Sequence, residues 1–557
     1  MTNYIQHFTS LFTPQKEPAR ADQVPNSAGG YTFALDKWAR LDRWLILGAE
    51  GGTYYASERV LTRENAKTIA ECLAEDGKRT VARIVTISES GRAPKNETAI
   101  FALALAAGDV SPETRKAALD AVPRVCRTGT DLFHFARDVE GFRKWGRGLR
   151  NAIARWYNDK PVERVAYQAL KYRERDGWSH RDLLRLAHPK AKTPQHDALY
   201  RFIVGGEEAL SKETAKGKAL DVAQLPAFVR AFGALKKATS KAEVVSLIRE
   251  HRFTHEMLLT EWKSEPDVWS ALLPDMPPGA MIRNLGKMTN VGVLAPMSDA
   301  SRLVVSRLTD KDRLARARIH PIAVLSALKV YEQGHGERAA RRANALSWTP
   351  VREIVDALNE AFYLAFKSVE PTGKKHLLAL DVSGSMGCGM IAGVPGLTPR
   401  VATAAMAMAT ARVERDFAAV AFTAASSGYG GQWGGGESGI TPLTLSPSQR
   451  LDDVIRTMES LPMGGTDCAL PMIWATRHKV PVDTFVVYTD NETWAGNVHP
   501  FQALRQYRQK MGRNAKLIVV GMTATGFTIA DPTDAGMLDV VGFDSSAPQV
   551  MADFARA

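Results

Sequence analysis

Short polar side chains of the kind that bind a hard cation follow an apolar run near residue 380. Asp381, Ser383 and Ser385 alternate with other residues directly after the apolar run 377–380. A tight turn that contains glycine can direct one carboxylate and two hydroxyl oxygens toward one point and leave positions for water. This pattern indicates the first part of a metal site built from oxygen ligands.

Two later loops can complete this site. Thr466 lies in the glycine-containing stretch 464–467, and Asp490 follows the apolar run 485–488, which has the character of a buried strand. The ends of such strands are where an open α/β sheet presents its ligand-binding residues. Few carboxylates are available, so water would fill the rest of an octahedron, which favours Mg²⁺. We therefore predict a divalent cation, most simply Mg²⁺, bound by Asp381, Ser383, Ser385, Thr466 and Asp490.

The alternative is that Ser383 and Ser385 cap the next helix and that Asp490 forms a turn. Capping alone would not require a carboxylate after each of two buried strands, so the metal site is the favoured interpretation. The sequence has no nucleophile elbow, P-loop or dinucleotide fingerprint. We therefore expect no enzymatic activity, and we expect the cation to gather an acidic ligand rather than to activate water.

A second group of candidate residues is basic and aromatic and lies in the stretches 144–150 and 171–190. Lys and Arg can hold phosphates and aromatic rings can stack unpaired bases, a mixture that suits single-stranded or looped RNA. Alternatively, Tyr172 and Trp178 belong to the core and the cations form a solvated face, and composition does not decide between the two. The candidate RNA-binding residues are Lys144, Arg147, Arg150, Lys171, Arg175, His180, Arg181 and His188.

The metal-site residues require a sheet, and the sequence after residue 370 predicts one. Strand-like runs occur at 377–380, 417–422, 484–489 and 516–521, and helical segments between them at 399–414, 448–460 and 501–511. This alternation predicts a doubly wound, mostly parallel, Rossmann-like sheet over 371–557. The Gly- and Trp-rich stretch 426–436 predicts a mobile surface loop.

The basic residues lie in a region whose pattern is almost wholly helical. Amphipathic segments recur at 63–75, 95–107, 111–122, 143–157, 162–173, 240–249, 319–331 and 351–366. Successive helices with short connections predict stacked, HEAT-like helical hairpins over 31–370. Residues 1–30 are rich in Pro, Gly and polar residues and predict a flexible N-terminal arm. The fold class is therefore multidomain, with an α-helical repeat domain followed by an α/β domain.

The composition of the 557 residues fits a folded protein with an anionic partner. The hydrophobic content is 45%, and the net charge of +12 divides into −1 from Pro371 onward and +13 before it. A basic excess confined to the helical region favours a polyanion, although a solubilising surface would have the same composition. No apolar run reaches membrane-spanning length, no secretory signal opens the sequence and the four cysteines show no CxxC spacing, so we expect a reducing cytoplasm.

The sequence resembles the Ro autoantigen family of RNA-binding proteins, in its bacterial form. In this family a TROVE domain of HEAT-like repeats precedes a von Willebrand factor A domain that carries a metal-ion-dependent adhesion site. The resemblance covers about residues 40–555 and is strongest at 51–55, 145–147, 177–180, 283–288, 381–386, 465–468 and 489–493. Matches of this length are more specific than short patterns.

The resemblance implies a ring of helical repeats that the A domain closes. Ro-like proteins bind small Y RNAs on the outer surface of the repeats and accept single-stranded ends of misfolded RNAs in a central hole. Lys171 and His188 then correspond to Y-RNA contacts, with Arg175, His180 and Arg181 on the same surface. Bacterial relatives use the Y RNA to tether a 3′-to-5′ exoribonuclease, which implies a scaffold in RNA quality control or the stress response.

A function of another class remains open: a divalent-metal-dependent protein-binding module, in which the A domain grips a carboxylate of a protein partner and the basic repeats only support it. We expect a monomer, because no spare amphipathic or coiled-coil segment is available for self-association.

Overall fold

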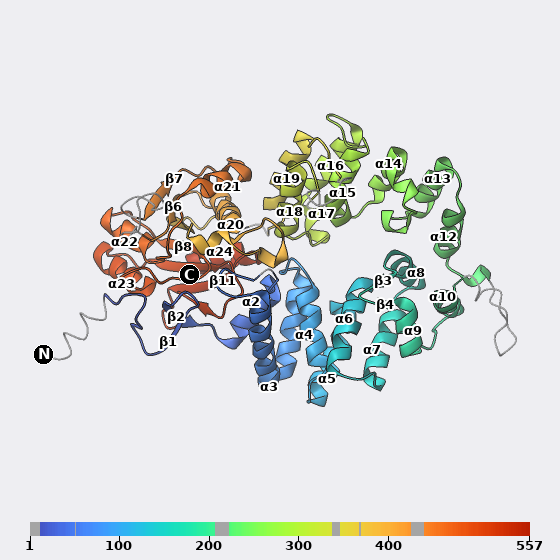
Figure 1. Ribbon diagram of the computed structural model, residues 1–557, viewed down its shortest axis with the longest axis horizontal. Coiled ribbons are helices and arrows are strands. Elements are labelled where there is room, and N and C mark those ends of the chain that lie inside the picture. Colours follow the sequence, from blue (N-terminus) through green and yellow to red (C-terminus); the bar gives the residue numbers. More distant parts are fainter. Residues whose placement is uncertain (1–11, 51, 207–221, 337–345, 367–368, 425–438) are drawn as a thin grey trace.

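The computed structural model describes residues 12–50, 52–206, 222–336, 346–366, 369–424 and 439–557. It consists of a helical domain and a C-terminal α/β domain, called the A domain below (Figure 1). The predicted combination of helical repeats with an α/β domain is confirmed. The loop predicted at 426–436 lies outside the described residues. None of the described helices is long and apolar enough to cross a membrane.

The helical domain is one curved row of helices, and both ends of the row lie against the A domain, so that the chain forms a ring (Figure 1). The first half of the row contains α2 (Lys37–Leu47), α3 (Glu58–Ser90), α4 (Glu97–Ala107), α5 (Pro112–Val125), α6 (Gly129–Phe142), α7 (Arg147–Asn158), α8 (Val162–Lys171), α9 (His180–Ala187) and α10 (Pro194–Gly205). A short hairpin, β3 (Glu174–Arg175) and β4 (Trp178–Ser179), connects α8 to α9.

The second half of the row returns to the A domain. It contains α12 (Ala227–Lys237), α13 (Lys241–His251), α14 (Pro266–Leu272), α15 (Pro278–Asn290), α16 (Asp299–Leu308), α17 (Lys311–Arg316), α18 (Pro321–Glu332) and α19 (Arg352–Leu364). Short 3₁₀ helices occur at η1 (Val222–Gln224), η2 (His255–Met257), η3 (Glu261–Ser264) and η4 (Leu273–Asp275).

Helix α3 is much longer than the segment predicted at 63–75. Gly77 has the appearance of a stop signal, because glycine is a poor helix former. In the structure it is a packing residue: a Cβ added there would lie 2.0 Å from Thr114 Oγ1 of α5. The helix continues beyond Gly77, with a local break at the preceding residue, Asp76, whose φ is −151° and ψ is 90°. The glycine therefore brings two helices close together instead of ending one of them.

The A domain is built on a six-stranded sheet of order β11-β9-β8-β5-β6-β7. Its strands are β5 (His376–Asp381), β6 (Phe417–Phe422), β7 (Ile440–Leu443), β8 (Thr484–Thr489), β9 (Lys516–Gly521) and β11 (Met537–Val541). All neighbouring pairs are parallel except β6 and β7, which are antiparallel. Chain order runs outward in both directions from the adjacent strands β5 and β8, as expected for a doubly wound sheet.

Helices cover both faces of this sheet. They are α20 (Pro399–Val413), α21 (Leu451–Ser460), α22 (Leu470–Arg477), α23 (Pro500–Met511) and α24 (Ala547–Arg556), with 3₁₀ turns η6 (Gly384–Gly387) and η7 (Ile391–Gly393). Because side chains alternate along a strand, Leu378 and Leu380 join the core shared with α20 and the helical domain, whereas Leu377 and Ala379 join a separate core with α22 and α23. One face of the sheet is therefore continuous with the core of the ring.

The N-terminal segment differs from the flexible arm predicted for residues 1–30. Residues 1–11 lie outside the described part, but β1 (Gln23–Pro25) pairs with β2 (Tyr31–Ala34), which pairs with β10 (Phe527–Thr528) of the A domain. Gln15 is fully buried, and its side-chain amide donates to Asp467 Oδ1 at 2.7 Å. Polar composition suggested an arm, but the polar groups are satisfied by the A domain.

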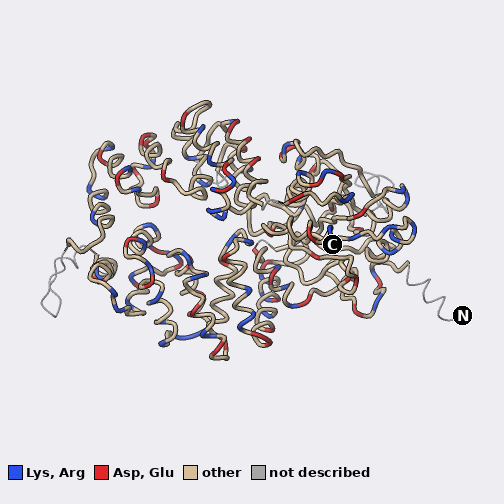
Figure 2. The backbone as a smooth tube through the Cα atoms, turned by 180° about the vertical axis from the view of Figure 1, so that it is seen from behind, with Lys and Arg blue, Asp and Glu red and all other residues tan. Residues whose placement is uncertain are grey.

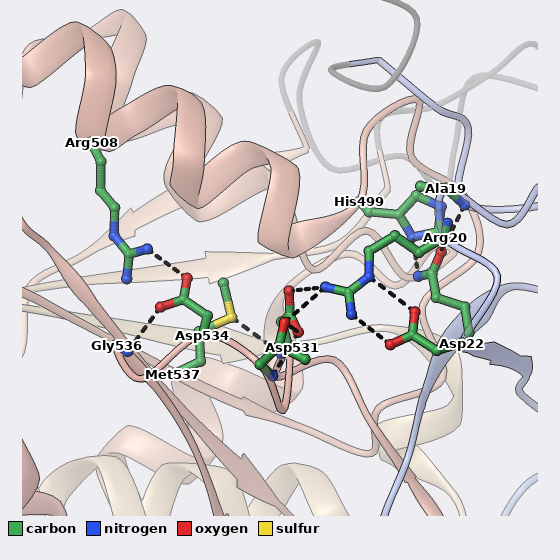
Figure 3. Close-up of polar contacts among 11 residues, drawn as sticks. Ala19, Arg20, Asp22, His499, Arg508, Asp531, Asp534, Gly536 and Met537 are labelled. Carbon is green, nitrogen blue, oxygen red and sulfur yellow. Dashed lines mark hydrogen bonds and ion pairs between the residues drawn. The ribbon is translucent and has the colours of Figure 1, made fainter. Parts of the chain in front are cut away.

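Charged contacts also fix the same segment to the A domain (Figure 3). Arg20 forms ion pairs with Asp531, which is buried, and with Asp22 of its own segment. His499 Nε2 lies 2.8 Å from the carbonyl oxygen of Glu17. Residues 12–34 therefore belong structurally with the A domain and lead directly into α2.

Candidate nucleic-acid interface and metal site

The predicted metal-site residues meet at the carboxyl ends of β5 and β8. Asp381 is the last residue of β5, and Asp490 directly follows β8. These strands are neighbours in the sheet, and the chain winds away from them in opposite directions. Such a switch point is where doubly wound sheets bind ligands. The structure therefore brings the two carboxylates together as the sequence predicted.

The hydroxyl residues lie in the same place. Asp381 Oδ1 accepts from the backbone N–H of Ser383 at 2.9 Å, and Oδ2 accepts from the Thr489 hydroxyl at 2.7 Å. The hydroxyls of Ser383 and Ser385 are 3.3 Å apart. The carbonyl of Thr466 accepts from Trp494 N at 3.1 Å, so the loop that carries Thr466 is tied to the loop after β8.

The capping alternative does not describe Ser383. This residue precedes η6, but its side chain makes no capping hydrogen bond. The first α-helix after it, α20, is capped instead by Thr398, whose hydroxyl accepts from Val401 N at 3.3 Å. The serine pattern therefore forms a loop with inward-facing hydroxyls rather than a helix cap.

The electrostatics of the site fit a cation. Burial raises the pKa of both Asp381 and Asp490, and the neighbouring charge of Asp490 raises the pKa of Asp381 further. The positive charge of Arg400 acts on Asp381, but its guanidinium donates to the carbonyl oxygens of Val382 and Ser383. Two buried carboxylates without a side-chain ion pair among the described residues suit a divalent cation.

The donor set is of the oxygen-rich type. The five predicted residues supply two carboxylates and three hydroxyls, which suits Mg²⁺ rather than a soft metal. Within the described ranges, no group of three or more His, Cys, Asp or Glu side chains comes together as a metal site. The residues present therefore fit a hard cation that retains water, which stays a prediction.

Two residues near this site were missed in the sequence. Glu492 is 1% exposed, and burial together with Asp490 raises its pKa to about 8. Burial, Asp490 and Glu492 raise the pKa of Tyr55 to about 12, and its hydroxyl lies within hydrogen-bonding reach of Ser385. The position of Glu492 two residues after Asp490 was an available signal. No local pattern could place Tyr55, which comes from the helical domain.

The predicted basic residues gather on neighbouring elements of the helical row. Lys144 precedes α7, Arg147 and Arg150 lie on its first turn, and Arg181 is the second residue of α9. All four are exposed, as are Arg175 of β3 and His188, the C-cap of α9. Lys and Arg also occur along the rest of the row, interspersed with acidic residues (Figure 2).

Local geometry holds this surface in place. The turn between β3 and β4 has positive φ at Asp176 and Gly177, as a tight hairpin requires. The Asp176 carboxylate accepts from Arg137 at 2.7 Å and lies 2.6 Å from His134 Nδ1, both on α6. Ser179 then caps α9 in a reciprocal capping box with Asp182. The hairpin and the start of α9 are therefore fixed to the preceding helix.

His180 is a correction to the predicted RNA-binding set. It is 2% exposed, and its Nδ1 lies 2.7 Å from the hydroxyl of Tyr157. Burial lowers its pKa to about 3, so the ring is neutral. His180, Leu183, Leu184 and Ala187 are all buried, which is the i, i+3, i+4, i+7 stripe of a helix. The side chain is therefore part of the core and not of an RNA-binding surface.

Lys171 is less accessible than the sequence suggested. Its side chain is 9% exposed, and its amine lies 3.7 Å from Glu256 of η2 and over the rings of Tyr167 and Tyr172. Tyr172 and Trp178 are partly buried against the core, and Trp178 packs on Trp145 with ring centroids 5.6 Å apart. Tyr172 and Trp178 therefore pack against the core, as the alternative interpretation of the sequence had it, whereas the exposed cations around them are accessible to a ligand.

Comparisons with known proteins agree with this architecture. The family model of the TROVE domain matches residues 24–330, and that of the Ro60 vWA domain matches residues 375–555. The RNA-binding protein RO60 of Deinococcus radiodurans is 42% identical over 560 residues, with 100% of this chain and 99% of that protein covered. The RNA-binding protein RO60 of Caenorhabditis elegans is 36% identical, with 97% and 91% covered.

A solved structure is also similar. The crystal structure of the Deinococcus radiodurans RO (RSR) protein matches with a TM-score of 0.68 and 42% identity, covering 94% of this chain and 99% of that one. Two domain models in the same order and full-length relatives confirm the resemblance found in the sequence. The chain therefore belongs to the Ro60 family, with a TROVE domain followed by a Ro60 von Willebrand A domain.

Proposed function

We propose that this protein is a noncoding-RNA-binding scaffold. Its family relatives are named RNA-binding proteins. The observation that carries the proposal is the set of exposed cations on α7 and α9. Among the described residues, no acidic side chain forms an ion pair with Lys144, Arg147, Arg150 or Arg181. Exposed cations without acidic partners are suited to phosphate groups, which supply most of the affinity for nucleic acids.

The RNA is a Y-like small RNA, bound on the outer surface of the helical row through this cluster with Arg175 and His188. Single-stranded ends of misfolded RNA enter the centre of the ring, and the Y-like RNA tethers a 3′-to-5′ exoribonuclease. The protein itself performs no cleavage, and it serves RNA quality control and the stress response. These finer assignments are supported by the family relationship and by the arrangement of the helices as a ring.

The A domain binds Mg²⁺ through Asp381, Ser383, Ser385, Thr466 and Asp490. The two carboxylates and the hydroxyls supply oxygen ligands, and their burial excludes bulk water from the bound ion. We also propose a monomer in a reducing cytoplasm. Support for that compartment comes from the four cysteines, all of which are free thiols.

The test compares two charge-matched triple variants in RNA-binding titrations over a salt series. One variant carries Arg147→Gln, Arg150→Gln and Arg181→Gln. The control carries three substitutions of exposed cations elsewhere on the row, Lys67→Gln, Lys116→Gln and Arg302→Gln. With a structured small RNA that has a single-stranded loop, the first variant should make the negative slope of log K against log salt shallower by about 2. Equal slopes for both variants would refute this surface.

A capture experiment with the same protein distinguishes the RNA scaffold from the alternative of a metal-dependent protein-binding module. Capture of a protein that depends on divalent cation, survives nuclease treatment and is lost in Asp381→Ala would support that alternative. Capture that nuclease abolishes would support the RNA scaffold, because the protein partner would then be held through RNA.

A further inference from the structure

A loop of the helical domain lies directly beside the cation site of the A domain. Residues 52–56 lie between α2 and α3, and Tyr55 from this loop is half-buried with its hydroxyl in reach of Ser385. The loop has its own fixed shape: Thr53 N donates to Ala56 O at 2.8 Å, and Ala56 N donates to the Thr53 hydroxyl at 3.0 Å. Tyr55 is therefore presented to the site by a defined turn.

The turn packs closely against the A domain. A Cβ added at Gly389 would lie 3.0 Å from the carbonyl oxygen of Gly52, so a larger residue at 389 would push the loop away. Gly389 has φ of +80°, which also favours glycine. The crevice between Gly52, Thr53 and the segment 390–392 has a volume of about 20 Å³, which is enough for about one water molecule. The loop and the A domain are therefore in close contact at this point.

The cation site itself is closed in this arrangement. The five predicted ligands are between 0% and 5% exposed. A site that grips the carboxylate of another protein needs an open side, and the described residues leave none that exposes a ligand. Tyr55 is the residue of the helical domain that reaches this side, through Ser385.

A third carboxylate, that of Glu492, lies next to the site and contacts the N-terminal segment. Glu492 Oε2 accepts from Ala28 N of the N-terminal segment at 3.0 Å. Its other oxygen, Oε1, is buried and has no hydrogen-bond partner among the described residues. An unpaired carboxylate oxygen that is buried costs free energy unless a cation or a water satisfies it. The surroundings of the site therefore come from three parts of the chain: the A domain, the N-terminal segment and the loop 52–56.

We propose that Tyr55 is a positioning residue of the cation site and that cation binding fastens the first loop of the helical ring onto the A domain. The phenol hydroxyl holds Ser385 in its inward orientation and covers the site. An external acidic ligand then enters only when the loop 52–56 moves away. The inference rests on the cation site proposed above and is independent of RNA binding.

The test uses the full-length chain, with Mg²⁺ as the probe. Isothermal titration calorimetry gives the Mg²⁺ affinity of the wild type, Tyr55→Phe and Tyr54→Phe. Tyr54 is a matched control, because it is adjacent, also carries a phenol and is 59% exposed. Tyr55→Phe removes only the hydroxyl and should weaken Mg²⁺ binding about fivefold, the equivalent of one hydrogen bond. Tyr54→Phe should bind as the wild type does.

Amide hydrogen exchange supplies a second readout that a merely structural tyrosine would not change. In the wild type, Mg²⁺ should slow exchange in residues 53–61, and Asp381→Ala should abolish this effect. Unchanged Mg²⁺ affinity in Tyr55→Phe would overturn the proposal. A wild type that binds no Mg²⁺ would overturn both this proposal and the cation site, while the RNA titrations would still decide the scaffold function separately.

Discussion

Asp544 of the A domain holds Arg92, which also contacts the last part of the helical row, and removal of the Asp544 carboxylate should open the ring locally. Its carboxylate accepts from Arg92 Nη2 at 2.7 Å and from Arg92 Nε at 3.0 Å, just after α3. The carbonyl of Arg92 accepts from His320 Nε2 at 3.1 Å, at the start of α18. The direction of that bond is fixed, because His320 Nδ1 already accepts from Ile322 N. One arginine therefore contacts the A domain and the far end of the row.

The magnitude follows from the burial of the pair. Asp544 is 4% exposed and the Arg92 side chain 25%. Breaking a fully buried ion pair costs about 3–5 kcal/mol because one charge is left without a partner. Since water reaches part of Arg92, we expect about 2–3 kcal/mol for Asp544→Ala. At about 1.4 kcal/mol per factor of ten, local opening should become about 30- to 140-fold more frequent.

Hydrogen exchange with mass spectrometry measures this opening directly. Peptides that cover 87–93 and 318–324 should exchange faster by this factor in Asp544→Ala, whereas peptides from α7 should not change. Asp553→Ala is the control, because Asp553 is 61% exposed and pairs with Arg556 on the surface of α24. An exposed pair contributes less than about 1 kcal/mol. Equal exchange in both variants would refute the assignment of this ion pair as the junction of the ring.

Three further predictions concern acid stability and the RNA-binding region. Burial lowers the pKa of His320 to about 4 from an unfolded value of about 6.5. The contribution of the neutral His320 to stability is therefore complete above pH 6.5 and is lost as the pH falls through 6.5 toward 4, about 3 kcal/mol in all. Thermal melts from pH 7.5 to 4.5 should show a smaller fall of the melting temperature with pH in His320→Gln than in the wild type. Tyr157→Phe removes the hydrogen-bond partner of His180 and should lower the free energy of unfolding in denaturant by about 1–2 kcal/mol, with RNA affinity unchanged. A loss of RNA affinity at unchanged stability would show instead that His180 belongs to the RNA-binding surface. Glu256→Gln removes the negative charge beside Lys171 and should increase RNA affinity about two- to fivefold in titrations at low salt. Because salt screens charge interactions, the increase should disappear at high salt, and an increase that persists there would contradict an electrostatic cause.

The inner strands β5, β6, β8 and β9 of the A domain could be predicted because each is a short apolar run followed by a turn. The predicted runs 417–422, 484–489 and 516–521 coincide with β6, β8 and β9. Both edge strands were missed. β7 is four residues long and contains Pro442, which weakens any strand pattern, and Asp539 interrupts the apolar residues of β11. Missing the two edge strands did not affect the site, because Asp381 and Asp490 follow the central strands β5 and β8.

Contacts between distant parts of the chain could not be predicted in the same way. Gln15 and Tyr55 lie hundreds of residues from the loops that they contact, and neither belongs to a periodic pattern. The N-terminal segment has the composition of an arm, and only the hydrogen-bonding groups of the A domain give it a fixed structure. The local sequence shows whether apolar residues recur with the period of a helix or of a strand. The contacts of Gln15 and Tyr55 depend instead on which surfaces the folded domains present to them.

His180 and Asp381 show how burial separates structural from functional polar residues. Both were predicted site residues, and both are almost completely buried. A buried histidine avoids the cost of a charge by losing its proton and bonding to a neutral neighbour, which is what His180 does with Tyr157. Burial and the neighbouring Asp490 raise the pKa of Asp381, so its charge can be neutralised by a proton or by a cation that both carboxylates and the nearby hydroxyls bind. Two adjacent buried carboxylates with hydroxyl groups around them suit a divalent cation. Burial therefore contradicts the predicted RNA-binding role of His180, whereas it is compatible with the predicted metal-binding role of Asp381.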